Sequence, residues 1–155
     1  MTTMSTATAP RFGSRRVVFV DASAFAVIAD PTVMYAGPAV RKEFEHLLEE
    51  YERGETILVT LETMAAPVLS EVCEIERMRP WLARAALQVL DDNPYMGLDP
   101  DLAAALVVME RRGIGHVLTI DPRFDAVDVT VLPDGSADVF TTWDPPAWPS
   151  RTSPR

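Results

Sequence analysis

Aspartates in three segments of the chain have the residue type and setting that metal chemistry requires. Asp21 follows the apolar run VVFV, Asp121 follows the run HVLTI, and Asp99 and Asp101 flank the start of an alanine-rich segment. Carboxylates within ~4–6 Å of one another repel unless a cation or a proton lies between them. Because no His or Cys stands with them as a ligand, such a cluster favours Mg²⁺ or Mn²⁺ over zinc.

The hydrophobic pattern predicts the elements that would position these aspartates. Short apolar runs rich in β-branched residues predict strands at 17–20, 56–60, 116–120 and 127–132. Helical periodicity predicts helices at 38–53, 61–78 (interrupted by Pro67), 80–90 and 100–112. Strands separated by helices imply crossover connections, so we expect a three-layer α/β/α fold with a mainly parallel sheet.

The expected sheet brings the aspartates to one edge. We expect VVFV to be the central strand with HVLTI beside it, because both runs are apolar and both end in an acid. Ligands of an open parallel sheet bind beyond the carboxyl ends of its strands, where Asp21 and Asp121 would lie. The start of the alanine-rich helix could point at the same edge. Clustering there would raise the pKa of at least one acid.

Each aspartate also has a structural interpretation. Asp99 or Asp101 could cap the alanine-rich helix by accepting its free N–H groups. Asp121 could begin the turn before its proline, and Asp21 could cap a short helix that begins at the next residue. These alternatives remain open from the residues alone.

Composition limits the classes of function. The 155 residues amount to about one domain. With 23 acids against 14 bases, the net charge of −9 argues against electrostatic coating of nucleic acid, but not against local RNA binding through metal. The single cysteine, Cys73, excludes an intrachain disulfide and fits a reducing cytosol. No apolar run reaches ~18 residues, so we expect no membrane span.

The chain divides into three parts by composition. We expect a flexible N-terminal arm at residues 1–15, one folded domain at 16–142, and a proline-rich tail at 143–155.

The order of the motifs resembles a PIN domain over roughly residues 16–132. The most specific stretch is DLAAALVVMERRGIGHVLTIDPRF, which has an acid at a helix start, a glycine stop, a strand and then T-x-D-x-x-F. D-x-S at Asp21 and Ser23, and LVT ahead of the next segment, complete the pattern. The small bacterial members of this family resemble toxins of VapBC-type toxin–antitoxin pairs. The resemblance implies a Mg²⁺- or Mn²⁺-dependent ribonuclease with a parallel sheet.

The resemblance also implies a set of metal ligands and a mechanism. Asp21, Asp101 and Asp121 would hold the metal and carry catalysis, with Asp99 as an alternate for Asp101. The metal would lower the pKa of a bound water for in-line attack on a phosphodiester.

Three further residues are expected around these ligands. Ser23 and Thr119 would orient a carboxylate or a water through their hydroxyl groups, and Arg123 would contact the RNA backbone. The alternatives are a turn or cap role for each hydroxyl and a solvated loop position for the arginine.

The chain departs from the family at one ligand. The family usually has a glutamate six or seven residues beyond the LVT threonine, where this chain has Ala66 and Pro67. Glu71, one helical turn past Pro67, could take that place. A solvated position for Glu71 is the alternative.

Two functions therefore remain open. The first is a cytoplasmic metal-dependent ribonuclease, the toxin of a pair, with an RNA substrate, an antitoxin protein partner and a homodimeric state. The second is a catalytically weak or inactive PIN-like module that binds a protein partner or RNA, which the missing glutamate and the acidic surface favour. A response-regulator-like or nucleotide-binding domain is disfavoured, because no glycine-rich phosphate loop is present.

Overall fold

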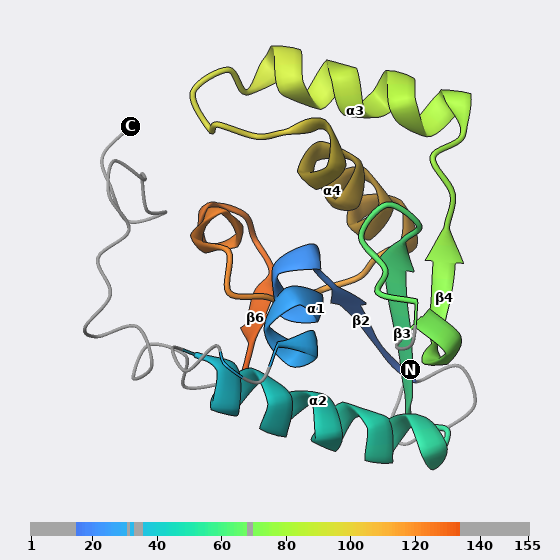
Figure 1. The fold of residues 1–155 in the computed structure, drawn as a ribbon. Coiled ribbons are helices and arrows are strands. Elements are labelled where there is room, and N and C mark those ends of the chain that lie inside the picture. Colours follow the sequence, from blue (N-terminus) through green and yellow to red (C-terminus); the bar gives the residue numbers. More distant parts are fainter. Residues whose placement is uncertain (1–14, 31, 33–35, 68–69, 134–155) are drawn as a thin grey trace.

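A parallel sheet with helices on both faces makes up the protein (Figure 1). The computed structural model describes residues 15–30, 32, 36–67 and 70–133. The strands are β2 (Arg16–Val20), β3 (Thr56–Leu61), β4 (Cys73–Glu76), β5 (His116–Leu118) and β6 (Thr130–Leu132). The helices are α1 (Ala22–Ala29), α2 (Gly37–Glu52), α3 (Pro80–Asp92) and α4 (Pro100–Arg112), with 3₁₀ helices η1 (Ser70–Val72) and η2 (Pro122–Ala126).

The central strand is β2, as the sequence predicts. The strand order is β4-β3-β2-β5-β6, and every pair of neighbours is parallel. In the register, Val18 of β2 pairs with Leu58 of β3 and with His116 of β5. The prediction that HVLTI lies beside VVFV is therefore confirmed. The carboxyl ends of β2 and β5 share one edge of the sheet.

Alternation along β2 separates two hydrophobic layers. Phe19 packs into the core under α3 and α4, whereas Val18 and Val20 pack into the core under α1 and α2. All three side chains are fully buried. They divide between the two cores because successive residues of a strand point to opposite faces of the sheet. The predicted three-layer α/β/α fold is confirmed, with α1 and α2 on one face and α3 and α4 on the other (Figure 1).

The helices predicted at 38–53, 80–90 and 100–112 are present with small shifts of their ends. Helix α4 begins with proline after its N-cap residue, Asp99, and is followed by the C-cap residue Gly113, whose φ of 67° is left-handed. Glycine favours this conformation because it has no Cβ. These local signals explain why α4 begins and ends where the sequence predicts.

The prediction of a helix at 61–78 is wrong. After β3 the chain turns, forms the short helix η1 and then pairs as β4, with Leu58 opposite Cys73 and Leu61 opposite Glu76. Pro67 lacks an N–H group and disfavours helix in the residue before it. The decisive interaction is pairing with β3, which local periodicity does not reveal.

The last two strands are shorter than predicted, since β5 ends at Leu118 and β6 begins at Thr130. The predicted arm at 1–15, apart from Arg15, and the predicted tail at 143–155 lie outside the described residues. In the described part of the chain, no helix is both long and apolar enough to cross a membrane.

Candidate functional site

Asp21 lies at the end of the central strand and is almost completely buried. It directly follows β2 and is the N-cap of α1, and only 3% of its surface is exposed. Its Oδ2 atom accepts hydrogen bonds from the Ser23 backbone N–H (3.2 Å), the Ser23 hydroxyl (2.6 Å) and the Thr119 hydroxyl (2.8 Å). The interpretation that Asp21 caps helix α1 is therefore correct, and all of these contacts use the same oxygen of the carboxylate.

Two hydroxyl groups connect the ends of β2 and β5. Ser23 Oγ accepts the backbone N–H of Ile120 (3.0 Å), and Thr119 Oγ1 accepts the backbone N–H of Asp121 (2.8 Å). The two hydroxyl oxygens lie 3.0 Å apart, farther than either lies from Asp21 Oδ2. The geometry therefore assigns both hydroxyl protons to Asp21. Ser23 and Thr119 fix the orientation of this carboxylate.

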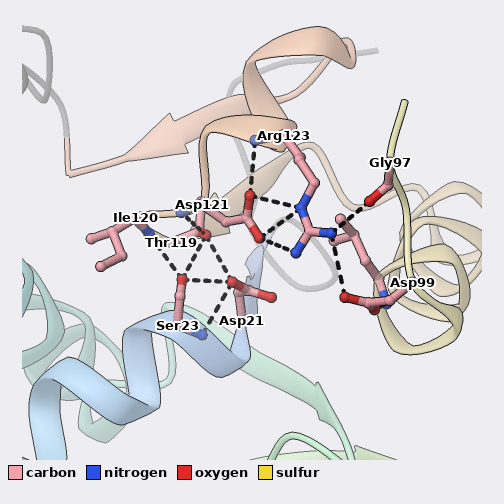
Figure 2. Close-up of polar contacts among 9 residues, drawn as sticks. Asp21, Ser23, Gly97, Asp99, Thr119, Ile120, Asp121 and Arg123 are labelled. Atoms are coloured by element: carbon pink, nitrogen blue, oxygen red, sulfur yellow. Dashed lines mark hydrogen bonds and ion pairs between the residues drawn. The ribbon is translucent and has the colours of Figure 1, made fainter. Parts of the chain in front are cut away.

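The second oxygen of Asp21 has no partner within the part of the chain that the structure describes. Among the described residues no hydrogen bond or ion pair reaches Asp21 Oδ1, although the side chain is buried. Figure 2 shows this oxygen on the side that faces Asp99. Buried polar atoms are rarely left without a partner in native structures. The lack of a hydrogen bond to this buried oxygen from any described residue is the feature of the site that points to a ligand.

Burial sets the pKa of Asp21. Loss of solvent raises the pKa of this carboxyl above its ordinary value of 3.8, while the hydrogen bonds from Ser23 and Thr119 oppose the rise. Repulsion from Asp121 also raises the pKa, but it is the weakest of these influences. The expected direction is confirmed, but clustering of acids is not its main cause.

The start of α4 contributes two more carboxylates. Asp99 caps the helix, with its Oδ1 accepting the backbone N–H of Leu102 at 2.8 Å. Asp101 lies in the first turn, and its Oδ1 accepts the hydroxyl of Thr63, just beyond β3, at 3.1 Å. The second oxygen of Asp101 has no hydrogen-bond partner among the described residues. Of the two acids, Asp99 is the cap and Asp101 is the less engaged.

Asp121 is bound by an arginine two residues along the chain. It caps η2 by accepting the backbone N–H of Arg123 at 2.9 Å. The Nε atom of Arg123 lies 3.0 Å from both carboxylate oxygens, and Nη2 lies 2.6 Å from Oδ2. The third nitrogen, Nη1, contacts Gly97 O (3.0 Å) and Asp99 Oδ2 (3.3 Å). Figure 2 shows the guanidinium between the two acids.

All four aspartates line one cleft. Asp21, Asp99, Asp101 and Asp121 surround a space of ≈ 380 Å³, together with Ser23, Arg123 and the start of α4. The four acids are separated by up to 100 residues in the chain, but the parallel sheet and the start of α4 bring them to one edge. The prediction that they converge at the carboxyl end of the strands is confirmed.

Glu71 lies at the end of the sheet opposite the cleft. The prediction that it could serve as an alternate metal ligand is therefore wrong. It belongs to η1, just before β4, and lines a cavity with Gly54 and Thr56 at the start of β3. Because β4 runs parallel to β3, this position is at the amino end of the strands. Glu71 therefore cannot replace the missing glutamate in the cleft.

The oxygen donors suit a hard divalent cation by type, but not by their present positions. Among the described residues, no group of three or more His, Cys, Asp or Glu side chains is placed to hold a metal ion. Asp21 Oδ1 and the second oxygen of Asp101 are available, whereas both oxygens of Asp121 contact Arg123. The charge of the Asp121 carboxylate is therefore already compensated by the Arg123 guanidinium.

Comparison of the whole fold identifies its type. No family model matches the chain, and no curated protein matches it. The solved structure of VapC20 from Mycobacterium tuberculosis, described as a sarcin–ricin loop cleaving toxin, superposes with a TM-score of 0.57 at 18% identity. The match covers 73% of this chain and 98% of VapC20. The chain has a VapC-like PIN fold. In this PIN fold the cleft lies beyond the carboxyl ends of β2 and β5.

Sequence reasoning about this PIN fold missed two contacts. It assigned Arg123 to RNA or solvent, whereas the side chain binds Asp121 and Asp99. The spacing Asp-Pro-Arg was the available signal, because an arginine two residues past a capping aspartate can fold back onto it. It also missed Thr63, whose hydroxyl holds Asp101. No local pattern in the sequence signals that contact.

Proposed function

We propose that the protein is a metal-dependent ribonuclease of the toxin type, with its active site in the aspartate cleft. The carrying observation is the buried Asp21, whose Oδ1 has no partner among the described residues and which lines one cleft with three further aspartates in a PIN fold. The similarity to VapC20, a toxin that cleaves the sarcin–ricin loop, supports RNA as the substrate class.

The proposed roles follow from the contacts of each residue. Asp21, Asp101 and Asp121 hold Mg²⁺ or Mn²⁺, with Asp99 as the alternate, and Ser23 and Thr119 orient Asp21. The bound cation supplies Lewis-acid activation of water and neutralises charge on the leaving oxygen of the phosphodiester.

The partners of the proposed toxin follow from its type. An antitoxin protein binds the toxin, the toxin is a homodimer, and the toxin acts on RNA in the cytoplasm. Two exposed apolar side chains, Leu87 on α3 (58% exposed) and Tyr95 just beyond it (92% exposed), support an apolar interface on this side.

A second candidate function is favoured by one observation. Arg123 occupies the carboxylate of Asp121, and no third acid stands free beside Asp21 and Asp101 among the described residues. If the guanidinium stays in place, the same cleft binds RNA or a protein partner without cutting.

The variant Asp21→Asn tests the nuclease proposal. Asn retains the cap but lacks the charged ligand oxygen, so the metal-free variant should be as stable as wild type or slightly more stable. Mn²⁺ at roughly 100 times its Kd stabilises a folded binder by about 2.7 kcal/mol. For a chain of this size that is a rise of roughly 5–10 °C in Tm. We expect this rise, and chelator-sensitive RNA cleavage, in wild type and not in Asp21→Asn.

A matched control lies nine residues along the chain. Asp30 accepts the backbone N–H (3.0 Å) and the hydroxyl (2.6 Å) of Thr32, the same two contacts that Asp21 accepts from Ser23, but it lies outside the cleft. Asp30→Asn should respond to Mn²⁺ as wild type does. An equal response to Mn²⁺ in Asp21→Asn and wild type would exclude Asp21 as a ligand and end the nuclease proposal.

A further inference from the structure

The strongest ionic contact of the cleft is made by a side chain of the protein itself. The guanidinium of Arg123 contacts two of the four aspartates of the cleft, at 2.6–3.0 Å from Asp121 and 3.3 Å from Asp99. A fork-shaped pair of this kind is stronger than an ordinary hydrogen bond, because both partners are charged and the geometry is bidentate. Only 22% of the Arg123 side chain and 14% of the Asp121 side chain are exposed, so solvent weakens the pair little.

The guanidinium and a divalent cation need the same oxygen atoms. Mg²⁺ and similar cations take about six oxygen ligands at close range and tolerate no positive group in that shell. Both oxygens of Asp121 and the second oxygen of Asp99 are engaged by Arg123. Among the described residues, the carboxylate oxygens of the cleft with no hydrogen bond are Asp21 Oδ1 and one oxygen of Asp101, and two such oxygens are few for tight binding of a divalent cation.

We propose that Arg123 is an internal cation that competes with the divalent metal for Asp121 and Asp99. The inference rests on the proposed function, since it concerns the metal of the same site. With the guanidinium in place, the acidic edge of the sheet is neutralised and its affinity for metal is low. The metal gains its third carboxylate when Arg123 leaves Asp121.

The fold allows this movement without a change of backbone. Phe124, the next residue, is 1% exposed and anchors η2 in the core beneath α3 and α4. The backbone N–H of Arg123 donates to Asp121 Oδ1 at 2.9 Å, a contact that does not involve the guanidinium. Only rotation about the side-chain bonds is needed, so η2 keeps Asp121 in position while its partner is exchanged.

The test compares Mn²⁺ affinities by isothermal titration calorimetry. Arg123→Ala removes the competing cation, and Arg123→Lys keeps the charge but loses the fork that contacts both oxygens. We expect Arg123→Ala to bind Mn²⁺ at least about tenfold more tightly than wild type, equivalent to ~1.4 kcal/mol. Arg123→Lys should fall between them. Because lysine preserves part of the contact, it carries the test if Arg123→Ala does not fold.

Arg112→Ala is the matched control. Arg112 also bridges two carboxylates, Glu74 (2.8 Å) and Glu76 (3.1 Å), and its loss changes the net charge from −9 to −10, as the loss of Arg123 does. Its Mn²⁺ affinity should equal that of wild type, because the pair lies at β4 and not in the cleft.

The possible outcomes separate this inference from the proposed function. Equal or weaker Mn²⁺ binding by Arg123→Ala and Arg123→Lys, with clear binding by wild type, would overturn the competition and leave the metal site standing. An equal gain in Arg112→Ala would also overturn it, since net charge alone would then explain the effect. Absence of Mn²⁺ binding in wild type and in all variants would instead overturn the metal-dependent function itself.

Discussion

The hydroxyl of Thr119 is the contact of the cleft whose loss can be predicted in most detail. The side chain is fully buried, donates to Asp21 Oδ2 at 2.8 Å and accepts the backbone N–H of Asp121 at 2.8 Å. Thr119→Val keeps the shape and removes both bonds. A hydrogen bond to a charged group contributes roughly 1.5–3 kcal/mol, and an orphaned N–H costs roughly 1–3 kcal/mol.

We therefore expect Thr119→Val to lower the free energy of unfolding by roughly 2.5–6 kcal/mol, the sum of these two contributions. At roughly 2–4 °C per kcal/mol for a chain of this size, Tm falls by about 5–24 °C. Urea unfolding of metal-free protein at pH 7 measures the change directly. Thr119→Ser, which keeps the hydroxyl and loses one methyl, should cost about 1 kcal/mol.

A double-mutant cycle identifies the partner. If Thr119 acts through Asp21, its loss should cost less in an Asp21→Asn background, because the bond then ends on a neutral group. A change of under about 0.5 kcal/mol in Thr119→Val would refute the reasoning, since surface substitutions without a specific role fall in that range. Full additivity with Asp21→Asn would refute the assignment of the Thr119 hydroxyl proton to Asp21.

Two further predictions concern regions outside the cleft. The hydroxyl of Thr56 and then the guanidinium of Arg16 hold the pKa of Glu50 below its ordinary value of 4.5, so the stabilisation by Glu50 is present above pH 4.5 and is lost as pH falls through the folded-state value. Glu50→Gln should therefore be less stable than wild type at pH 7, with a gap that narrows in urea titrations below pH 4.5; a constant gap would contradict the pair. For the proposed homodimer, light scattering at roughly tens of micromolar should give the mass of two chains. A single-chain mass there would argue against it.

The sheet was predictable because its signal is local. The runs at 17–20, 56–60 and 116–118 are apolar and β-branched, and the crossover rule then fixes their parallel pairing. β4 was not predictable in this way. It lies within the segment 61–78, for which the sequence predicts a helix, and residues 73–76 become a strand through pairing with β3.

The same division applies to the site. The positions of Asp21 and Asp121 follow from the rule for strand ends, because each is attached directly to a strand. The ion pair of Arg123 depends on how a long side chain folds back and on where the loop carrying Gly97 lies. Neither is encoded in hydrophobic periodicity. Sequence reasoning therefore located the acids and not the cation that binds them.

The composition of β4 bears on how copies of the chain can meet. This four-residue strand, CEIE, is an edge strand of the sheet, since β3 is its one neighbouring strand within the described part of the chain. Edges of this kind recruit strands from other molecules unless charge or shortness prevents it. Glu74 and Glu76 place two carboxylates there, tied to Arg112. A second copy aligned on this edge would bring like charges together, which disfavours self-association by extension of the sheet through β4.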